Sequence, residues 1–448
     1  MSTQAFELLI TGAQCHCPGG LVEVDVGIAG GQIRWLGRAD ASTKAERVLD
    51  ARGLVVLPGI IDSQVHFREP GLEHKEDLES GTRAAVFGGV TTIFEMPNTN
   101  PNTDTRERLL DKLERARGRA HSNYAFFVGA TAANADGLAE LELLPGASGV
   151  KIFMGSSTGS LLVADDETLV RVLAHGRRRV AVHCEDEPRL IERKPLVASG
   201  APVSMHHVWR DVETARLATE RLLRAARRTL RPVHVLHVTT RDEMELLARN
   251  KDIATVEVTP QHLTLSAPDC YERIGSRAQM NPPIRESEHQ AALWDAVRNG
   301  IVDVLGSDHA PHTLEEKAQP YPKSPSGMPG VQTMLPIMLD HVSKHRLSLG
   351  RLVDLLCEGP ARIYNIRGKG RIAVGYDADL TLVDLKLRQR VVDADMQSKC
   401  GWTPFADMTL EGWPRTTVVG GQIVVHEGQL TTPGRGKPVR FWDVPDSQ

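Results

Sequence analysis

The sequence predicts an α/β protein, a (β/α)8 TIM-like barrel with a small β-sandwich domain formed by both termini. Between residues 58 and 369, short β-rich runs alternate with helical patterns. Such sustained alternation favours parallel βα units, and about eight strands favour closure into a barrel over an open sheet. Both ends of the chain read instead as short strands. A Gly-Gly-Gln-Ile turn occurs near each end, at 30–33 and 420–423, so we expect the ends to share one domain.

The expected boundaries follow this change of pattern. Residues 1–57 with 370–448 form the predicted β-sandwich domain, and 58–369 form the predicted barrel. Early strands are expected at 6–10, 22–28 and 32–36. After a first strand within the stretch 58–71, barrel strands are expected at 91–96, 123–128, 149–153, 180–183, 233–238, 254–258 and 302–306. Helices are expected at 78–87, 106–117, 166–174, 212–228, 241–249, 287–297 and 347–357.

Amino-acid composition and net charge indicate which kinds of molecule this protein binds. Of 448 residues, 41% are hydrophobic and 25% charged, as in ordinary globular proteins, and the net charge is −4. This balance does not indicate a nucleic acid or an acidic membrane as partner, and no run reaches the ~18 apolar residues of a membrane span. The N-terminus has no signal-peptide pattern, and six scattered cysteines fit reduced thiols, so we expect a cytoplasmic protein with a small-molecule substrate.

The stretch 58–71 is the first indication of a reaction site. Asp62, Gln64, His66 and Arg68 recur at period two, which places them on one face of a strand. An acid, an amide, an imidazole and a guanidinium make a poor packing surface, but they can make a reaction site. The alternative is an edge strand with a solvated polar face.

Four further polar residues end or interrupt apolar runs in the barrel: Lys151, His183, His237 and Asp308. A lone strand histidine is often a core residue, and a lone lysine often extends to solvent. Functional residues of such barrels nevertheless lie at the carboxyl ends of strands, and with His66 these are ligands of the type that zinc takes. Lys151 would be repelled by a cation unless it reacted with carbon dioxide to become an anionic carbamate able to bridge two metals.

The motifs resemble those of the amidohydrolase superfamily, and within it those of the dihydroorotases. Residues 62–71 are similar to the family's D-x-H-x-H-x-R-E-P-G motif. The resemblance covers nearly the whole chain, because further segments match in order at 95–99, 182–185, 234–238, 257–263, 280–285, 308–312, 375–380 and 403–405.

The resemblance implies a zinc-dependent cyclic amidohydrolase of pyrimidine biosynthesis that interconverts dihydroorotate and N-carbamoyl-L-aspartate. One or two Zn²⁺ ions are expected, the first held by His66, carboxylated Lys151 and Asp308, and the second by Lys151, His183 and His237. Zinc lowers the pKa of bound water to about 7, and Asp308 would carry the proton to the leaving nitrogen. The implied substrate-binding residues are Arg68, Asn98, Asn281 and His312.

Three glutamines depart from the family pattern. Gln64 replaces the first histidine of H-x-H, Gln261 precedes His262 where a histidine pair is common, and Gln279 stands where a basic residue is frequent. An amide oxygen is a poorer zinc ligand than imidazole, so Gln64 is a doubtful ligand. The site could hold one metal, or Gln64 could coordinate through its oxygen or through water.

Two other functions stay open at this point. One is a hydantoinase- or allantoinase-type cyclic ureide hydrolase, which shares the metal ligands. The other is a catalytically weak dihydroorotase-like partner subunit of aspartate carbamoyltransferase. The group of Arg68, Asn98 and His312 favours a carboxylate substrate, because an arginine fork binds a carboxylate through two parallel hydrogen bonds. For an active enzyme we expect a homodimer.

Overall fold

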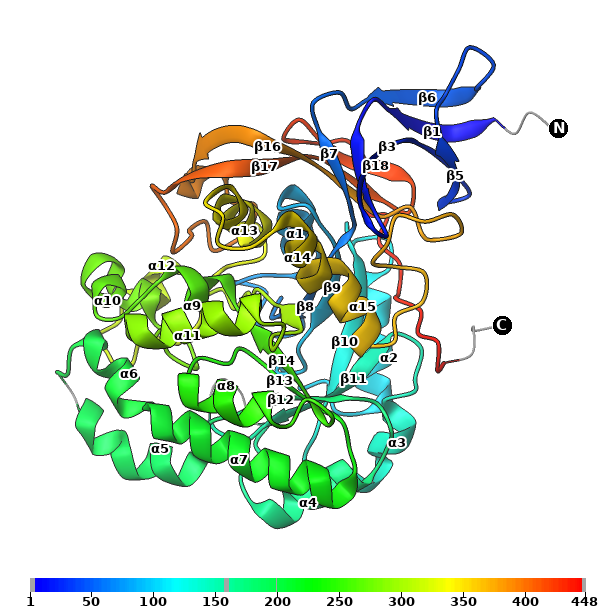
Figure 1. Cartoon of the computed structure of the whole chain (residues 1–448). Coiled ribbons are helices and arrows are strands. Elements are labelled where there is room, and N and C mark those ends of the chain that lie inside the picture. Colours follow the sequence, from blue (N-terminus) through cyan, green and yellow to red (C-terminus); the bar gives the residue numbers. More distant parts are fainter. Residues whose placement is uncertain (1–4, 157–160, 199, 445–448) are drawn as a thin grey trace.

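Eight parallel strands form the centre of the protein. The computed structural model describes residues 5–156, 161–198 and 200–444 (Figure 1). The strands pair in sequence order, and a parallel bridge between Val65 and His309 brings the first strand to the segment after the last. The predicted (β/α)8 fold is therefore confirmed. The barrel strands are β8 (Ile60–Val65), β9 (Val90–Glu95), β10 (Asn123–Gly129), β11 (Ala147–Phe153), β12 (Val180–His183), β13 (Val233–Val235), β14 (Ala254–Val258) and β15 (Val304–Leu305).

Helices surround this barrel, and several begin at a capping side chain. The Asp77 carboxylate accepts from Ser80 N at 2.8 Å, and that of Asp211 from Thr214 N at 3.0 Å. No helix in the described ranges is long and apolar enough to cross a membrane. The helices are α1 (Leu78–Phe87), α2 (Arg106–Ala116), α3 (Leu138–Leu141), α4 (Asp166–Ala174), α5 (Glu187–Arg193), α6 (His206–Trp209), α7 (Val212–Thr229), α8 (Arg241–Ala248), α9 (Pro260–Thr264), α10 (Asp269–Ile274), α11 (Ser287–Arg298), α12 (Leu314–Lys317), α13 (Met334–Ser343), α14 (Leu349–Val353) and α15 (Gly359–Ile363).

Strands from both ends of the chain share one sheet beside the barrel. The seven-stranded sheet has the order β19-β18-β17-β16-β7-β2-β3, so β7 lies between β2 and the C-terminal strands. Figure 1 shows β7 from the N-terminal part beside β16 and β17 from the C-terminal part. A four-stranded sheet, β5-β4-β1-β6, completes this part. Residues 1–4 and 445–448 of the predicted sandwich domain lie outside the described residues. The strands are β1 (Phe6–Thr11), β2 (Gln14–Cys17), β3 (Gly20–Glu23), β4 (Asp25–Ala29), β5 (Gln32–Gly37), β6 (Ala45–Asp50), β7 (Val55–Pro58), β16 (Leu380–Arg390), β17 (Thr409–Val419), β18 (Gln422–His426) and β19 (Gln429–Leu430).

Three expectations need correction. The single strand expected at 22–28 is two strands, because β3 pairs with β2 in one sheet and β4 pairs with β1 and β5 in the other. The helix expected at 347–357 is α14 followed by a π-helical turn, η5 (Asp354–Glu358). The edge-strand alternative for 58–71 is wrong, since every residue of β8 is buried.

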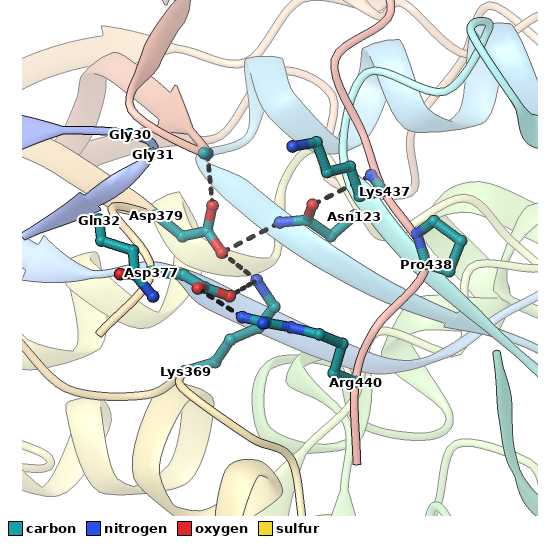
Figure 2. Close-up of a pocket in the computed structure, with 11 residues that line it drawn as sticks. Gly30, Gly31, Gln32, Asn123, Lys369, Asp377, Asp379, Lys437, Pro438 and Arg440 are labelled. Atoms are coloured by element: carbon teal, nitrogen blue, oxygen red, sulfur yellow. Dashed lines mark hydrogen bonds and ion pairs between the residues drawn. The ribbon is translucent and has the colours of Figure 1, made fainter. Parts of the chain in front are cut away.

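The two Gly-Gly turns meet beside the barrel. A side-chain carbon at Gly31 would lie 3.1 Å from Gly420 O, so the turns pack backbone to backbone. The carboxylate of Asp379 joins them to the barrel, because it accepts from Gly420 N at 2.7 Å and from Asn123 Nδ2 at 3.0 Å (Figure 2). The buried ammonium of Lys369 also pairs with Asp379. The two ends of the chain and strand β10 are thus tied at one point.

The C-terminal segment closes the end of the barrel where the strands begin. Val439 N donates to Tyr124 O at 2.9 Å, and the ring of Phe441 packs 5.9 Å from that of Phe94. Arg178 forms a two-pronged ion pair with Asp443, with N–O distances of 2.7 and 2.8 Å. This end is opposite to the carboxyl ends of the strands, where barrel enzymes place their sites.

Candidate active site

A small cavity lies at the carboxyl ends of the barrel strands and encloses about 20 Å³. A space of this size admits about one water or ion, since one water needs roughly 10–15 Å³ by this measure. The predicted metal ligands all line it, and Asn281, Ser326 and Gly327 complete part of its wall. The ligands brought together here are Gln64, His66, Lys151, His183, His237 and Asp308.

His66, Asp308 and Gln64 form one side of the cavity. His66 Nε2 lies 3.3 Å from Asp308 Oδ1, and Gln64 Nε2 donates to the same oxygen at 3.0 Å. Burial lowers the pKa of His66, so its imidazole is neutral at neutral pH. The buried Gln64 Oε1 has no hydrogen-bond partner among the described residues. Gln64 therefore orients Asp308 with its amide nitrogen and keeps an oxygen free for a further partner.

His183 and His237 form the other side. His183 Nδ1 lies 3.1 Å from His237 Nε2, and the ring centroids are 4.8 Å apart. Burial lowers the pKa of both rings, that of His237 most strongly, so both carry a lone pair at neutral pH. His237 Nδ1 is buried without a partner in the described part of the chain. Two neutral imidazoles with converging nitrogens are suited to a shared cation.

Lys151 lies inside β11, with only 1% of its surface exposed. Its ammonium lies 4.5 Å from the centroid of the Phe153 ring. Burial lowers the pKa of Lys151 to about 7, so a large fraction of the amine is unprotonated at neutral pH. Only the unprotonated amine can react with carbon dioxide, and this environment therefore favours carbamate formation.

The arrangement fits a metal only if Lys151 takes part. The described His, Cys, Asp and Glu side chains do not form a group of three that could hold an ion. The positive charge of Lys151 helps to lower the pKa of His66, His183 and His237. Lys151 therefore lies close to the ligands on both sides of the cavity. As a carbamate, Lys151 would supply the third ligand to each pair. The free oxygen of Gln64 adds a further neutral donor.

Arg68, His312 and Asn98 lie beside this cavity. Arg68 is 2% exposed, donates through Nε to Pro311 O at 3.2 Å, and places NH2 3.4 Å from His312 Nε2. No carboxylate of the described chain lies within ion-pair distance of its guanidinium. Burial lowers the pKa of Arg68 to about 10, so it stays charged at neutral pH. Asn98 Oδ1 accepts from His66 Nδ1 at 2.8 Å, and this leaves His66 Nε2 as the nitrogen that faces Asp308.

The structure adds two residues to the site that the sequence did not assign. Glu185 Oε2 accepts from His183 Nε2 at 2.9 Å and also pairs with the guanidinium of Arg210. Burial opposes the ionisation of Glu185, but Arg210 and His183 outweigh it and hold its pKa below the usual range. Because His183 Nε2–H donates its hydrogen bond to Glu185, His183 Nδ1 is left as the acceptor. An acid two residues after a strand-end histidine was the signal available in the sequence.

Comparisons with known proteins agree with this arrangement. The sequence profile of the amidohydrolase family matches residues 55–424. A protein named dihydroorotase from Methanosarcina mazei is 35% identical over 432 residues, which cover 93% of this chain and 94% of the relative. The chain belongs to the amidohydrolase family. A second dihydroorotase, from Methanothermobacter thermautotrophicus, is 33% identical to this amidohydrolase over 91% of the chain and 92% of the relative.

Solved structures of similar fold come from neighbouring members of the family. The L-hydantoinase (dihydropyrimidinase) from Arthrobacter aurescens superposes with a TM-score of 0.92 at 30% identity, covering 97% of this chain and 99% of that one. The dihydropyrimidinase from Brevibacillus agri NCHU1002 gives a TM-score of 0.90 at 27% identity, covering 98% and 99%. This amidohydrolase is therefore a cyclic amidohydrolase of the dihydroorotase and hydantoinase group.

Proposed function

We propose that this amidohydrolase is a metal-dependent dihydroorotase, which interconverts dihydroorotate and N-carbamoyl-L-aspartate. The buried guanidinium of Arg68, which has no acidic partner in the described chain, carries this proposal. Burying a charge without a direct ion pair costs free energy, and a bound carboxylate would recover part of it. Dihydroorotate carries a carboxylate on its ring, whereas unsubstituted hydantoin does not. The dihydroorotase names of the relatives support the same substrate.

The proposed metal is zinc, one or two ions per chain. His66, carboxylated Lys151 and Asp308 would hold the first ion, and Lys151, His183 and His237 the second. Bound zinc would supply Lewis acidity that polarises the ring amide and makes water at the site more acidic. The unpartnered Gln64 Oε1 and His237 Nδ1 are consistent with a site built for further ligands.

The chain's own groups would perform the positioning and the proton transfer. Arg68 and His312 would hold the substrate carboxylate, which orients the ring amide toward Asp308. The Asp308 carboxylate would accept a proton from the attacking water and pass it to the ring nitrogen as the C–N bond breaks. Gln64 Nε2, 3.0 Å from Asp308 Oδ1, fixes the direction of that carboxylate. The same steps in reverse close carbamoyl aspartate to the ring.

Metal analysis combined with turnover assays tests this proposal. We expect zinc in the purified protein and hydrolysis of dihydroorotate at a higher kcat/KM than that of hydantoin or allantoin. Zinc-loaded protein that opens hydantoin or allantoin and ignores dihydroorotate would instead establish a hydantoinase-type enzyme. That second function is favoured by the TM-score of 0.92 to the Arthrobacter aurescens hydantoinase.

The oligomeric partners are also proposals. A homodimer is expected for an active enzyme, and light scattering of the purified protein measures it. Protein without metal and without turnover would support the role of a non-catalytic subunit. Co-purification with aspartate carbamoyltransferase would then identify the partner.

A further inference from the structure

A lysine outside the predicted site contacts the far side of His312. Leu72 N donates to Arg68 O at 3.2 Å and Lys75 N to Leu72 O at 3.0 Å, so the chain after β8 turns back beside Arg68. The Lys75 side chain is 12% exposed, and its Nζ lies 3.1 Å from His312 Nδ1. Glu316 Oε1 holds the same ammonium at 3.0 Å.

These contacts decide which nitrogen of His312 carries the proton. An ammonium is only a donor, so His312 Nδ1 must accept from Lys75. A backbone carbonyl is only an acceptor, so His312 Nε2, which lies 3.0 Å from Ser326 O, must donate. The other tautomer would place an N–H against the ammonium and a lone pair against the carbonyl. The two shorter contacts therefore favour hydrogen on Nε2, over the longer contacts of Nδ1 with Glu316 Oε2 at 3.6 Å and of Nε2 with Arg68 NH2 at 3.4 Å, which suit the other tautomer.

The ring is also held neutral. Three cationic groups face it, Arg68, Lys75 and Lys317, against one acid, Glu316, whose Oε2 is 3.6 Å from Nδ1. Burial in the first place, and then these three cations, lower the pKa of His312 to about 3. The side chain is therefore a neutral N–H donor across the physiological range.

Arg68 lies beside the Nε2–H donor of His312. Arg68 NH2 lies 3.4 Å from His312 Nε2, but both atoms carry hydrogen, so neither can accept from the other. Two adjacent donors can share one acceptor, and Arg68 makes no ion pair with a carboxylate of the described chain; a bound carboxylate would accept the His312 hydrogen in place of Ser326 O. We propose that Lys75 is a positioning residue that fixes His312 as a neutral Nε2–H donor, so that His312 and Arg68 together bind the substrate carboxylate. This inference rests on the proposed function for the identity of that carboxylate.

The spectroscopic test needs no substrate. Long-range ¹H–¹⁵N spectra of the histidines, with a His312→Gln variant for assignment, report which ring nitrogen is protonated. We expect an unprotonated Nδ1 and a protonated Nε2 in the wild-type protein. In Lys75→Met, the Nδ1 proton should appear beside Glu316 and the pKa of His312 should rise. The same tautomer and the same titration in both proteins would overturn the inference.

Kinetics test the consequence for binding. Lys75→Met should raise KM for dihydroorotate about tenfold, the effect of losing one hydrogen bond to a charged group, and change kcat about twofold at most. Lys75→Arg keeps a cationic donor and should restore most of the affinity. An unchanged KM in Lys75→Met would overturn the positioning role. If dihydroorotate is not turned over at all, the proposed function fails, whereas the spectra still decide whether Lys75 fixes His312.

Discussion

Replacing Arg68 by methionine should separate activity from stability. Methionine keeps much of the apolar volume of the side chain and removes the charge. In the free protein this charge is buried, and among the described residues its one hydrogen bond to backbone is the 3.2 Å contact with Pro311 O. The variant should bind a carboxylate substrate poorly and yet fold at least as well as the parent.

The magnitudes follow from those contacts. A guanidinium that grips a carboxylate makes two charge-assisted hydrogen bonds of about 1.5–3 kcal/mol each, so kcat/KM for dihydroorotate should fall about 10²–10⁴-fold. Removing this buried charge recovers its desolvation free energy, several kcal/mol, but loses its attraction to nearby acids such as Asp308 and Glu95, and the unsatisfied Pro311 O costs about 1–3 kcal/mol. The melting temperature should therefore stay level or rise.

Steady-state kinetics and thermal unfolding measure the two effects on the same samples. Arg178→Met is the matched control, because Arg178 is also buried but is paired with Asp443 through two contacts of 2.7 and 2.8 Å. That variant should lose stability and keep the KM for dihydroorotate. An Arg68→Met protein that melts well below the parent while its KM is unchanged would refute the reasoning.

Three further substitutions test other parts of the structure. Lys151→Ala should lose metal and activity, with partial rescue by a short carboxylic acid, and full metal retention would contradict the carbamate. Gln64→His should raise the zinc content measured by mass spectrometry by one ion per chain, and an unchanged content would show that Gln64 does not limit the first site. Gly59→Ala should destabilise the protein by about 1–3 kcal/mol, because the added carbon would collide with Thr91 Oγ1 and lie 2.7 Å from Asp379 Cβ. Gly137→Ala, with no atom within 4 Å of the added carbon, is its control in the same melts.

The sequence predicted the barrel well where local signals agree with the fold. The helices at 78–87 and 166–174 match α1 and α4 at both ends, and the start of each is marked by a capping aspartate. The run 22–28 has the pattern of one strand, but Glu23 and Asp25 belong to strands in different sheets, and that division depends on pairing with distant residues. The π-helical turn at 354–358 has the same hydrophobic spacing as an α-helix over so short a length, so periodicity could not distinguish the two.

In the candidate site, too, the sequence could predict only what local patterns show. The period-two pattern of β8 and the polar strand ends identified the residues that the structure gathers around one cavity. Residue spacing assigns no role to Glu185 or Lys75, because their importance lies in which ring nitrogen they contact, on His183 and His312 respectively. Hydrogen-bond direction is a property of the assembled site and is not visible in residue spacing.

The segment that closes the floor of the barrel has a consequence for biosynthesis. The last barrel strand ends at Leu305, whereas the residues that cover the strand starts, Val439 to Asp443, follow well over a hundred positions later. A ribosome adding about 5–20 residues per second would expose Phe94 and its aromatic neighbours for several seconds before Phe441 emerges to cover them. Until then the nascent barrel presents an apolar opening, which is the kind of surface that chaperones bind during translation.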